Sequence, residues 1–396
     1  MIKKFFLLCF CFFSLMTLNA ENKETQKVKE KEQMEKERFY YDVCCSAPRL
    51  NPGEYVSVGF IGNSGTLSPF GNNIVDGGMG CGMDGVARDR SRKYCLPKAV
   101  EAMWVSYSDR KVYSVASLLP YDMILSLFND GGTPCIPASQ DTTREERLRL
   151  IQGLDLCFMP EGKVMLYVKA PVKCILLDWS ATGNEVTDDN ILSKLYKRRE
   201  LDDIESFFDK MSSYPEDEHW TSYRSKHGSV APLLERYLQR FNYTLNFEFE
   251  NEETSVYSVE SYFTNGEHYD RTPKYNEAFK MPSRLKEFWV MWDYKDSRYS
   301  CYMYFNEAEV LKVFDEAYGG EDRTQKGELK IKVCKYNNLF DISLNVGDKS
   351  IKLEKTAIRV FRRPIENPTK AGELIYKNYK GDHTNFFADD DEYVGE

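Results

Sequence analysis

An internal repeat constrains the fold of this chain more than any other feature of its sequence. Residues 96–130 return in degraded form at residues 281–316. The alignment pairs aromatic positions in the two copies: Trp104 with Trp289 and, after a one-residue insertion, Tyr113 with Tyr299. Because a repeat of this kind is one supersecondary unit used twice, the sequence predicts two related modules in tandem.

Each copy has the pattern of two strands, one helix and a three-strand meander. The predicted helices span 121–129 and 307–317, and Asn306 with Glu309 has the capping-box spacing that satisfies N–H groups at a helix start. One helix on a sheet is a stable two-layer arrangement. We therefore expect an α+β fold of two tandem related modules, each an antiparallel β-sheet with one packed helix, joined by a helical connector.

Shifts in composition along the chain divide it into six predicted segments. The connector contains two amphipathic stretches, 201–211 and 229–238, whose apolar residues recur at helical spacing. The segments are a signal peptide at 1–20, a charged tether at 21–39, the first module at 40–185, the helical connector at 186–241, the second module at 242–364 and a polar acidic tail at 365–396.

The N-terminus has the pattern of a secretory leader. Lys3-Lys4 precede an apolar run, and Leu18-Asn19-Ala20 precede Glu21, so we expect cleavage after Ala20. Cys9 and Cys11 lie too early in the apolar run for an ordinary lipidation site, so a lipid anchor or an uncleaved leader is the alternative. No later stretch is apolar and long enough to span a membrane, so we expect no transmembrane segment after leader removal.

Nine cysteines remain after leader removal, and an odd number leaves at least one free thiol or an intermolecular bond. Cys81 and Cys95 flank a Gly-rich loop and form the candidate disulfide. Within predicted strands, other cysteines are expected to pack as small hydrophobes.

The charge balance limits the classes of partner. The formal net charge is −9, and no basic stripe is present, so we expect no nucleic-acid partner. The acidic run Glu216, Asp217 and Glu218 is the candidate partner contact. It predicts another protein with a basic surface, because complementary potentials speed encounter and reject wrong partners.

Catalytic and metal-binding motifs are missing from the sequence. It contains no H-E-x-x-H, no G-x-S-x-G and no C-x-x-C, and its Gly-rich loop lacks the G-K-[ST] ending of a phosphate-binding loop. We therefore predict no cofactor, no metal and no catalytic residue. A Ser/His/Asp triad or a pair of catalytic carboxylates stays open, because such residues need not be close in sequence.

Several short motifs resemble a family of bacterial exported proteins catalogued as domain of unknown function 2931. The similarity extends over most of residues 50–360. The residues that carry it are Leu96-Pro97, Trp104-Val105-Ser106, Lys111-Val112-Tyr113, Leu119-Pro120, Leu125, Phe128, Met159-Pro160-Glu161-Gly162, residues 237–243 and Thr264-Asn265-Gly266-Glu267. The resemblance implies an envelope protein of a Gram-negative bacterium, often a lipoprotein, with no established activity.

Three functions are compatible with these observations. The expected one is an exported protein of the periplasm or cell envelope that acts as a non-catalytic protein-binding module, an immunity protein being one form. An envelope hydrolase with a site between the two modules is the first alternative. The second is a structural or carbohydrate-binding envelope protein, which would present exposed tryptophan or tyrosine side chains such as Trp104, Trp220, Trp289 and Trp292.

Overall fold

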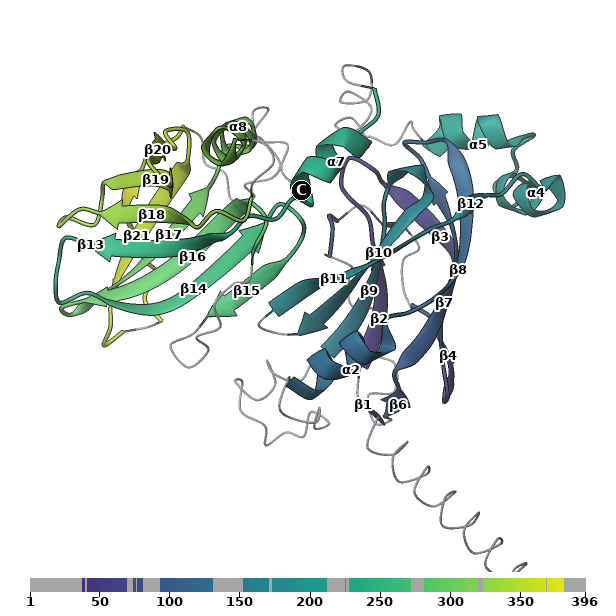
Figure 1. Ribbon diagram of the computed structural model, residues 1–396, viewed down its shortest axis with the longest axis horizontal. Coiled ribbons are helices and arrows are strands. Elements are labelled where there is room, and N and C mark those ends of the chain that lie inside the picture. Colours follow the sequence, from purple (N-terminus) through teal and green to yellow (C-terminus); the bar gives the residue numbers. More distant parts are fainter. Residues whose placement is uncertain are drawn as a thin grey trace, which may run out of the picture.

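The computed structural model shows a mixed α+β protein that consists mostly of β-strands (Figure 1). Among the described residues there are five α-helices and four sheets, the largest with ten strands. The description covers residues 38–39, 41–69, 74–75, 77–80, 93–130, 152–170, 173–211, 225, 228–271, 281–319, 323–367 and 369–380.

Strands of two large sheets, one two-stranded pair and one helix build the first half. Four of its strands belong to the ten-stranded sheet: β2 (Tyr41–Ser46), β9 (Gln152–Phe158), β10 (Lys163–Ala170) and β11 (Lys173–Thr182). The six-stranded sheet contains β3 (Gly53–Gly62), β4 (Gly65–Leu67), β5 (Ile74–Val75), β7 (Pro97–Ser106), β8 (Lys111–Leu118) and β12 (Asn184–Glu185). The remaining elements are the pair β1 (Arg38–Phe39) and β6 (Tyr94–Cys95) and the helix α2 (Tyr121–Asp130).

The second half has the same kinds of element. Its strands in the ten-stranded sheet are β14 (Ser255–Phe263), β15 (His268–Arg271), β16 (Leu285–Tyr294), β17 (Ser297–Tyr304), β21 (Ala357–Pro364) and β22 (Glu373–Lys377). A four-stranded sheet contains β13 (Tyr243–Phe249), β18 (Gly327–Val333), β19 (Phe340–Val346) and β20 (Lys349–Lys352). Helix α8 (Glu307–Tyr318) begins as predicted, because the Asn306 side chain accepts a hydrogen bond from the Glu309 N–H at 3.0 Å.

The prediction of one antiparallel sheet in each module is wrong in two respects. Each half has two sheets that share one core, so that Trp104 of β7 stacks on Phe158 of β9 with ring centroids 4.9 Å apart. Two strand pairs, β2 with β9 and β13 with β18, are parallel. A single helix of ten or twelve residues is too small to cover both hairpin and meander, and a second sheet buries the remaining apolar faces.

The predicted equivalence of Trp104 and Trp289 does not match the strand register. Trp104 lies opposite Tyr113 across the β7–β8 hairpin, and the residue opposite Tyr299 across β16–β17 is Trp292. Ring centroids are 5.5 Å apart in both pairs. The turn between β16 and β17 is two residues shorter than the turn between β7 and β8. When the two hairpins are aligned by their strand pairing, the position equivalent to Trp104 is therefore Trp292 and not Trp289.

Three helices follow the first half in the chain: α4 (Asp189–Lys197), α5 (Ile204–Met211) and α7 (Ala231–Tyr237). In Figure 1, α7 lies between the two halves and α4 and α5 lie at the outer side of the first half. Their apolar side chains form a third core together with Tyr107 and Tyr167 of the first half and Leu311 of α8. The helices therefore pack mainly against the first half, and the cluster reaches the second half at Leu311.

A buried ion pair joins the halves where β11 pairs with β15. The Arg240 guanidinium donates to both carboxylate oxygens of Glu267 at 2.8 Å, and Glu267 also accepts the Leu176 N–H at 3.1 Å. The Tyr167 hydroxyl donates to the Asn265 carbonyl at 2.6 Å. Gly266 has a φ of +79°, and a Cβ there would lie 2.2 Å from the Met79 carbonyl oxygen, so only glycine fits this contact.

Candidate functional site

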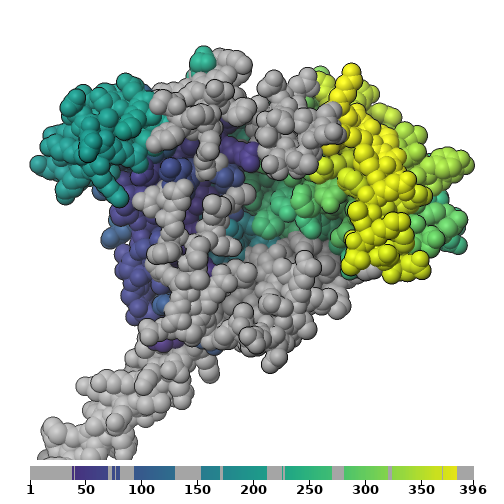
Figure 2. Space-filling model, turned by 180° about the vertical axis from the view of Figure 1, so that it is seen from behind, coloured from purple at the N-terminus to yellow at the C-terminus, as the bar shows by residue number. Residues whose placement is uncertain are grey.

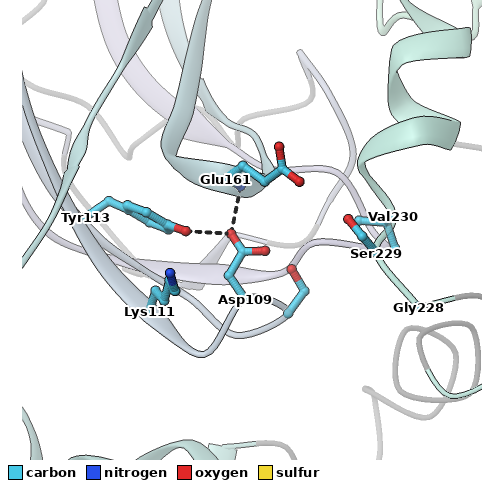
Figure 3. Close-up of a pocket in the computed structure, with 8 residues that line it drawn as sticks. Asp109, Lys111, Tyr113, Glu161, Gly228, Ser229 and Val230 are labelled. Carbon is cyan, nitrogen blue, oxygen red and sulfur yellow. Dashed lines mark hydrogen bonds between the residues drawn. The ribbon is translucent and has the colours of Figure 1, made fainter.

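A pocket with a volume of about 570 Å³ opens in the first half, and Figure 3 shows its polar lining. Its walls come from the β7–β8 turn, from the short 3₁₀ turn η1 (Pro160–Gly162) and from the segment that leads into α7. Eight residues line it: Ser108, Asp109, Lys111, Tyr113, Glu161, Gly228, Ser229 and Val230. Because these walls consist of turns and loops together with the start of β8 on a rigid sheet scaffold, this is a place where binding groups are commonly found.

Asp109 holds two of the walls together. Its Oδ2 accepts the Glu161 N–H at 2.8 Å and the Tyr113 hydroxyl at 3.2 Å, as the dashed lines in Figure 3 show. The Asp109 carboxylate and burial both raise the pKa of the Tyr113 hydroxyl, with burial the larger cause. Asp109 therefore positions the η1 turn and keeps Tyr113 a hydrogen-bond donor.

The η1 turn depends on a tight contact with an aromatic ring. Glu161 and Gly162 both have a positive φ, 60° and 75°. A Cβ on Gly162 would lie 2.8 Å from the Tyr113 ring, and Tyr113 in turn packs on the buried Trp104. The Pro-Glu-Gly sequence thus fixes the backbone so that the Glu161 side chain lies on the rim of the pocket (Figure 3).

The charges of the pocket are not balanced. Lys111 is the one cation among the described residues of the lining, and its Nζ is already paired with Glu185 Oε2 at 2.7 Å. Glu161 is exposed, and its carboxylate makes no ion pair with any described residue. Asp109 uses Oδ2 for its two hydrogen bonds, which leaves Oδ1 as a further acceptor. Two carboxylates therefore face the pocket with acceptor capacity that the described chain does not use.

The opposite wall supplies hydroxyl and apolar surface. Ser229 is exposed and lies across the pocket from Glu161 in Figure 3, whereas Val230 is buried in the third core. Ser108 is buried and donates a hydrogen bond to Asn51, so it supports the turn and is not a free nucleophile. The part of the lining that the structure describes includes neither histidine nor cysteine. This geometry suits recognition of a cationic group such as an ammonium or guanidinium, and it offers no nucleophile paired with a base.

The residues predicted from sequence lie elsewhere or beyond the described part of the chain. Glu216, Asp217 and Glu218 fall outside the described residues, and so do Cys81 and Trp220. Cys95 is buried in β6, and its pairing with Cys81 stays a prediction. Trp104 and Trp292 are buried in the two cores, which removes both as exposed platforms, whereas Trp289 is half-buried.

Sequence reasoning missed Asp109 and Glu161 as a site. Asp109 lies in the charged turn of a predicted hairpin, and Glu161 lies in a Pro-Glu-Gly turn that indicated only a change of direction. They are 52 positions apart, so no local spacing connects them. The one available signal was a charged residue at the centre of each turn.

Searches of the described residues for other chemistry give the following results. No group of three or more His, Cys, Asp or Glu side chains there is placed to hold a metal ion. Within the same residues, no helix is long and apolar enough to cross a membrane.

Comparison with known proteins places the chain in a family. The family model described as protein of unknown function, DUF2931, matches residues 22–221, which include the first half of the structure, α4 and α5. The resemblance predicted from later motifs, such as residues 237–243, lies outside that match. No curated protein and no solved structure matches the chain.

Proposed function

The chain belongs to the DUF2931 family of proteins of unknown function, and we propose that it is an exported cell-envelope protein that acts as a non-catalytic protein-binding module. The observation that carries the proposal is the pocket lined by the Asp109 and Glu161 carboxylates, neither of which forms an ion pair with a described residue. An unpaired carboxylate in an open pocket attracts a lysine or arginine side chain of a partner. The acidic run 216–218 is expected to extend this preference for a basic surface.

Export rests on the leader pattern of residues 1–20. The native protein, purified and sequenced from its N-terminus, should begin near Glu21 and be found in the periplasm or envelope. An intact Met1 on a cytoplasmic protein would overturn export and leave the binding proposal standing.

The binding proposal is tested by a single change in the pocket. Glu161→Gln keeps the size of the side chain and removes its charge, and Glu200→Gln is the matched control, since Glu200 is also an exposed glutamate with a positive φ of 57°. Each variant is immobilised, exposed to an envelope extract and analysed by quantitative mass spectrometry. We expect a partner that wild type and Glu200→Gln retain and Glu161→Gln retains at least fivefold less.

Two results would overturn this function. Equal capture by Glu161→Gln and wild type would remove the pocket from the contact surface. Turnover of an envelope substrate by the purified protein, abolished by one side-chain change that leaves folding intact, would replace binding with catalysis.

The two halves are further proposed to be tandem modules related by duplication. Two features support this. In both halves the strand that follows the long helix pairs in parallel with an early strand, β9 with β2 after α2 and β18 with β13 after α8. Both halves also place a buried tryptophan opposite a tyrosine in the hairpin, Trp104 with Tyr113 and Trp292 with Tyr299. An experimental structure in which Trp292 and Trp104 fall at different positions after superposition of the halves would contradict the proposal.

A further inference from the structure

Among the edge strands of this protein, β13 differs from the others in length, regularity and exposure. It ends the four-stranded sheet, and its seven residues pair with β18 and with no other described strand, in unbroken register from Tyr243 to Phe249. None of the seven is a glycine or a proline. An edge of this kind is a template for pairing with another chain, and proteins usually protect it with short strands, bulges, lysines or a cover.

The other described edges have such protection. Strands β1, β4, β5, β6 and β12 contain only two or three residues each. β20 has four residues, and two of them are Lys349 and Lys352. β22, which belongs to the yellow segment at the right of Figure 2, has five residues and pairs with β21 through a bulge. In β2 five of six residues are buried, whereas in β13 only Tyr243 is. Within the described part of the chain, β13 is therefore the long, regular edge that stays open.

The backbone of β13 has unused hydrogen-bonding groups along this edge. The Asn242 carbonyl accepts an N–H from β18 at 2.7 Å, and the Glu250 N–H donates to a β18 carbonyl at 3.0 Å. Because the residues of a strand direct their backbone groups alternately to its two sides, the even-numbered residues bond to β18. The N–H and C=O groups of Leu245, Phe247 and Phe249 therefore point to the open edge, where no described strand pairs with them.

The ten-stranded sheet extends beneath this edge. The Phe247 ring of β13 is 5.6 Å from the Phe288 ring of β16, and the Phe340 ring of β19 is 5.8 Å from the Tyr376 ring of β22. The two sheets therefore stack with their strands in the same order, and the open edge of β13 lies on the side of β14. Figure 1 shows β13 as the strand of its sheet nearest to β16 and β14.

The strand β14 presents apolar side chains toward the space beside β13. Val256 and Val259 lie opposite Trp292 and Val290, two residues of the core, so their side chains point to the same face of the sheet. Val256 is nevertheless 40% exposed, and Val259 is only partly buried. A strand added to β13 would stand above β14 and cover both valines.

The surroundings of the edge determine what can occupy it. The ten-stranded sheet continues beyond β13 through β14 and β15 to β11, so a second copy of the chain would bring its own ten-stranded sheet against this one. A single extended segment meets no such obstacle. Exposed Glu252 and Glu253 follow the C-terminal end of β13, and exposed Lys326 lies at its N-terminal end, where Gly327 pairs with Tyr243. An antiparallel segment with a basic N-terminal end therefore matches the charges at both ends.

We propose that β13 is a docking edge for an extended segment of a partner protein, which adds to the four-stranded sheet as an antiparallel fifth strand. The open backbone groups of β13 bind the segment, the valines of β14 select apolar side chains at alternate positions, and the acidic turn after β13 selects a basic N-terminal end. This inference extends the proposed protein-binding function to a second site and does not depend on the pocket at Glu161.

The probe is a synthetic peptide of two lysines followed by three valine-threonine repeats. Hydrogen exchange of the full protein is read at single amides by mass spectrometry with electron-transfer fragmentation. Saturating peptide should slow exchange about tenfold or more at the amides of Leu245, Phe247 and Phe249, because these N–H groups gain acceptors. The amides of β20, at the opposite edge of the same sheet, are the internal control and should not change. Unchanged exchange at the three amides at about 1 mM peptide would overturn the proposal.

Methylation of the peptide backbone tests the strand pairing itself. In an antiparallel strand beside β13, the valines face the core side and direct their N–H groups to β13, whereas the threonines direct theirs away. Methylating the three valine nitrogens removes three hydrogen bonds and should weaken binding about a hundredfold. Methylating the three threonine nitrogens is the matched control and should weaken binding far less. Equal effects of the two modifications would rule out strand addition.

A charge exchange tests the direction of the segment. Glu253→Lys should weaken binding of the lysine peptide about fivefold and strengthen binding of a peptide with glutamates in place of its lysines. Glu354→Lys changes another exposed glutamate, next to β20, and should alter neither affinity. Equal effects of the two variants would contradict docking at β13. Glu161→Gln should bind the peptide as tightly as wild type, so that a failure of this inference and a failure of the pocket proposal are separate results.

Discussion

Removing the Glu267 carboxylate is expected to weaken the protein far more than removing an equally close ion pair on its surface. Glu267 is 1% exposed and accepts from Arg240, Leu176 and Asn265. Glu267→Ala leaves these donors unpaired at the junction of the two halves. Breaking a buried ion pair costs roughly 3–5 kcal/mol. Since the Arg240 side chain is 34% exposed and can regain some water, we expect a loss at the lower end, about 3 kcal/mol.

The matched control is Glu373→Ala. Glu373 pairs with Arg362 at 2.7 Å, but both side chains are exposed, by 67% and 46%. Surface pairs of this kind contribute up to about 1 kcal/mol. Free energies of unfolding come from urea titrations followed by circular dichroism and by tryptophan fluorescence. Coincident curves would establish that the free energies are well defined.

A double-mutant cycle isolates the pair itself. Arg240→Ala alone leaves the Glu267 carboxylate buried without its cation, so the double variant should lose less stability than the sum of the single losses, by 1 kcal/mol or more. Equal losses for Glu267→Ala and Glu373→Ala would refute the reasoning that burial sets the size of the effect. Strict additivity in the cycle would refute a direct interaction between the two side chains.

Two further predictions concern the pocket turn and the response to acid. Gly162→Ala should lower the free energy of unfolding by roughly 1–3 kcal/mol, because φ is +75° and the new methyl group meets Tyr113 at 2.8 Å. The control is Gly228→Ala, which has a similar φ of +78° but open space around it and should lower the free energy of unfolding less. Equal losses of the two variants in urea titrations would contradict the contact with Tyr113. Burial and the nearby Lys169 lower the pKa of His268 to about 4, so the folded state keeps it neutral while the unfolded state takes up a proton below about pH 6.5. The contribution of neutral His268 to the free energy of unfolding is complete above about pH 6.5. It is lost as the pH falls toward 4, by on the order of 2–3 kcal/mol. If a His268→Asn variant loses as much free energy of unfolding as wild type between about pH 6.5 and 4, another group is responsible.

The predictable parts of the fold were the local ones. Helix α8 and its cap followed from Asn306 and Glu309, because a cap and an amphipathic stripe are written within one or two turns. The parallel pairing of β2 with β9 joins Tyr41 to Gln152 and leaves no local pattern. The second sheet of each half was missed for this reason, since it depends on pairing between segments far apart in the chain, Tyr41 with Gln152 in one half and Tyr243 with Gly327 in the other.

The site was hidden for a related reason. Asp109 and Glu161 belong to two different turns, and only the packing of η1 on Tyr113 brings the Glu161 N–H to the Asp109 carboxylate. Sequence reasoning instead selected the run 216–218, where acidic residues are adjacent in the chain. Residues that are neighbours in the chain can be recognised from the sequence, whereas residues that only the fold brings together cannot.

A comparison of two glutamates, one inside the family match and one beyond it, shows how the same residue type can serve folding or remain available to a ligand. The Glu267 carboxylate accepts hydrogen bonds from Arg240, Leu176 and Asn265. It therefore contributes to folding, and few of its lone pairs are left for a ligand. The other motif residue, Glu161, has a backbone N–H that is held by Asp109 and a carboxylate that no described residue pairs. The same residue type therefore serves the junction in one motif and stays available in the other. The two glutamates differ in whether other residues of the protein already donate hydrogen bonds to the carboxylate oxygens. Because the Glu161 carboxylate accepts none from the described residues, a partner should be sought at the pocket.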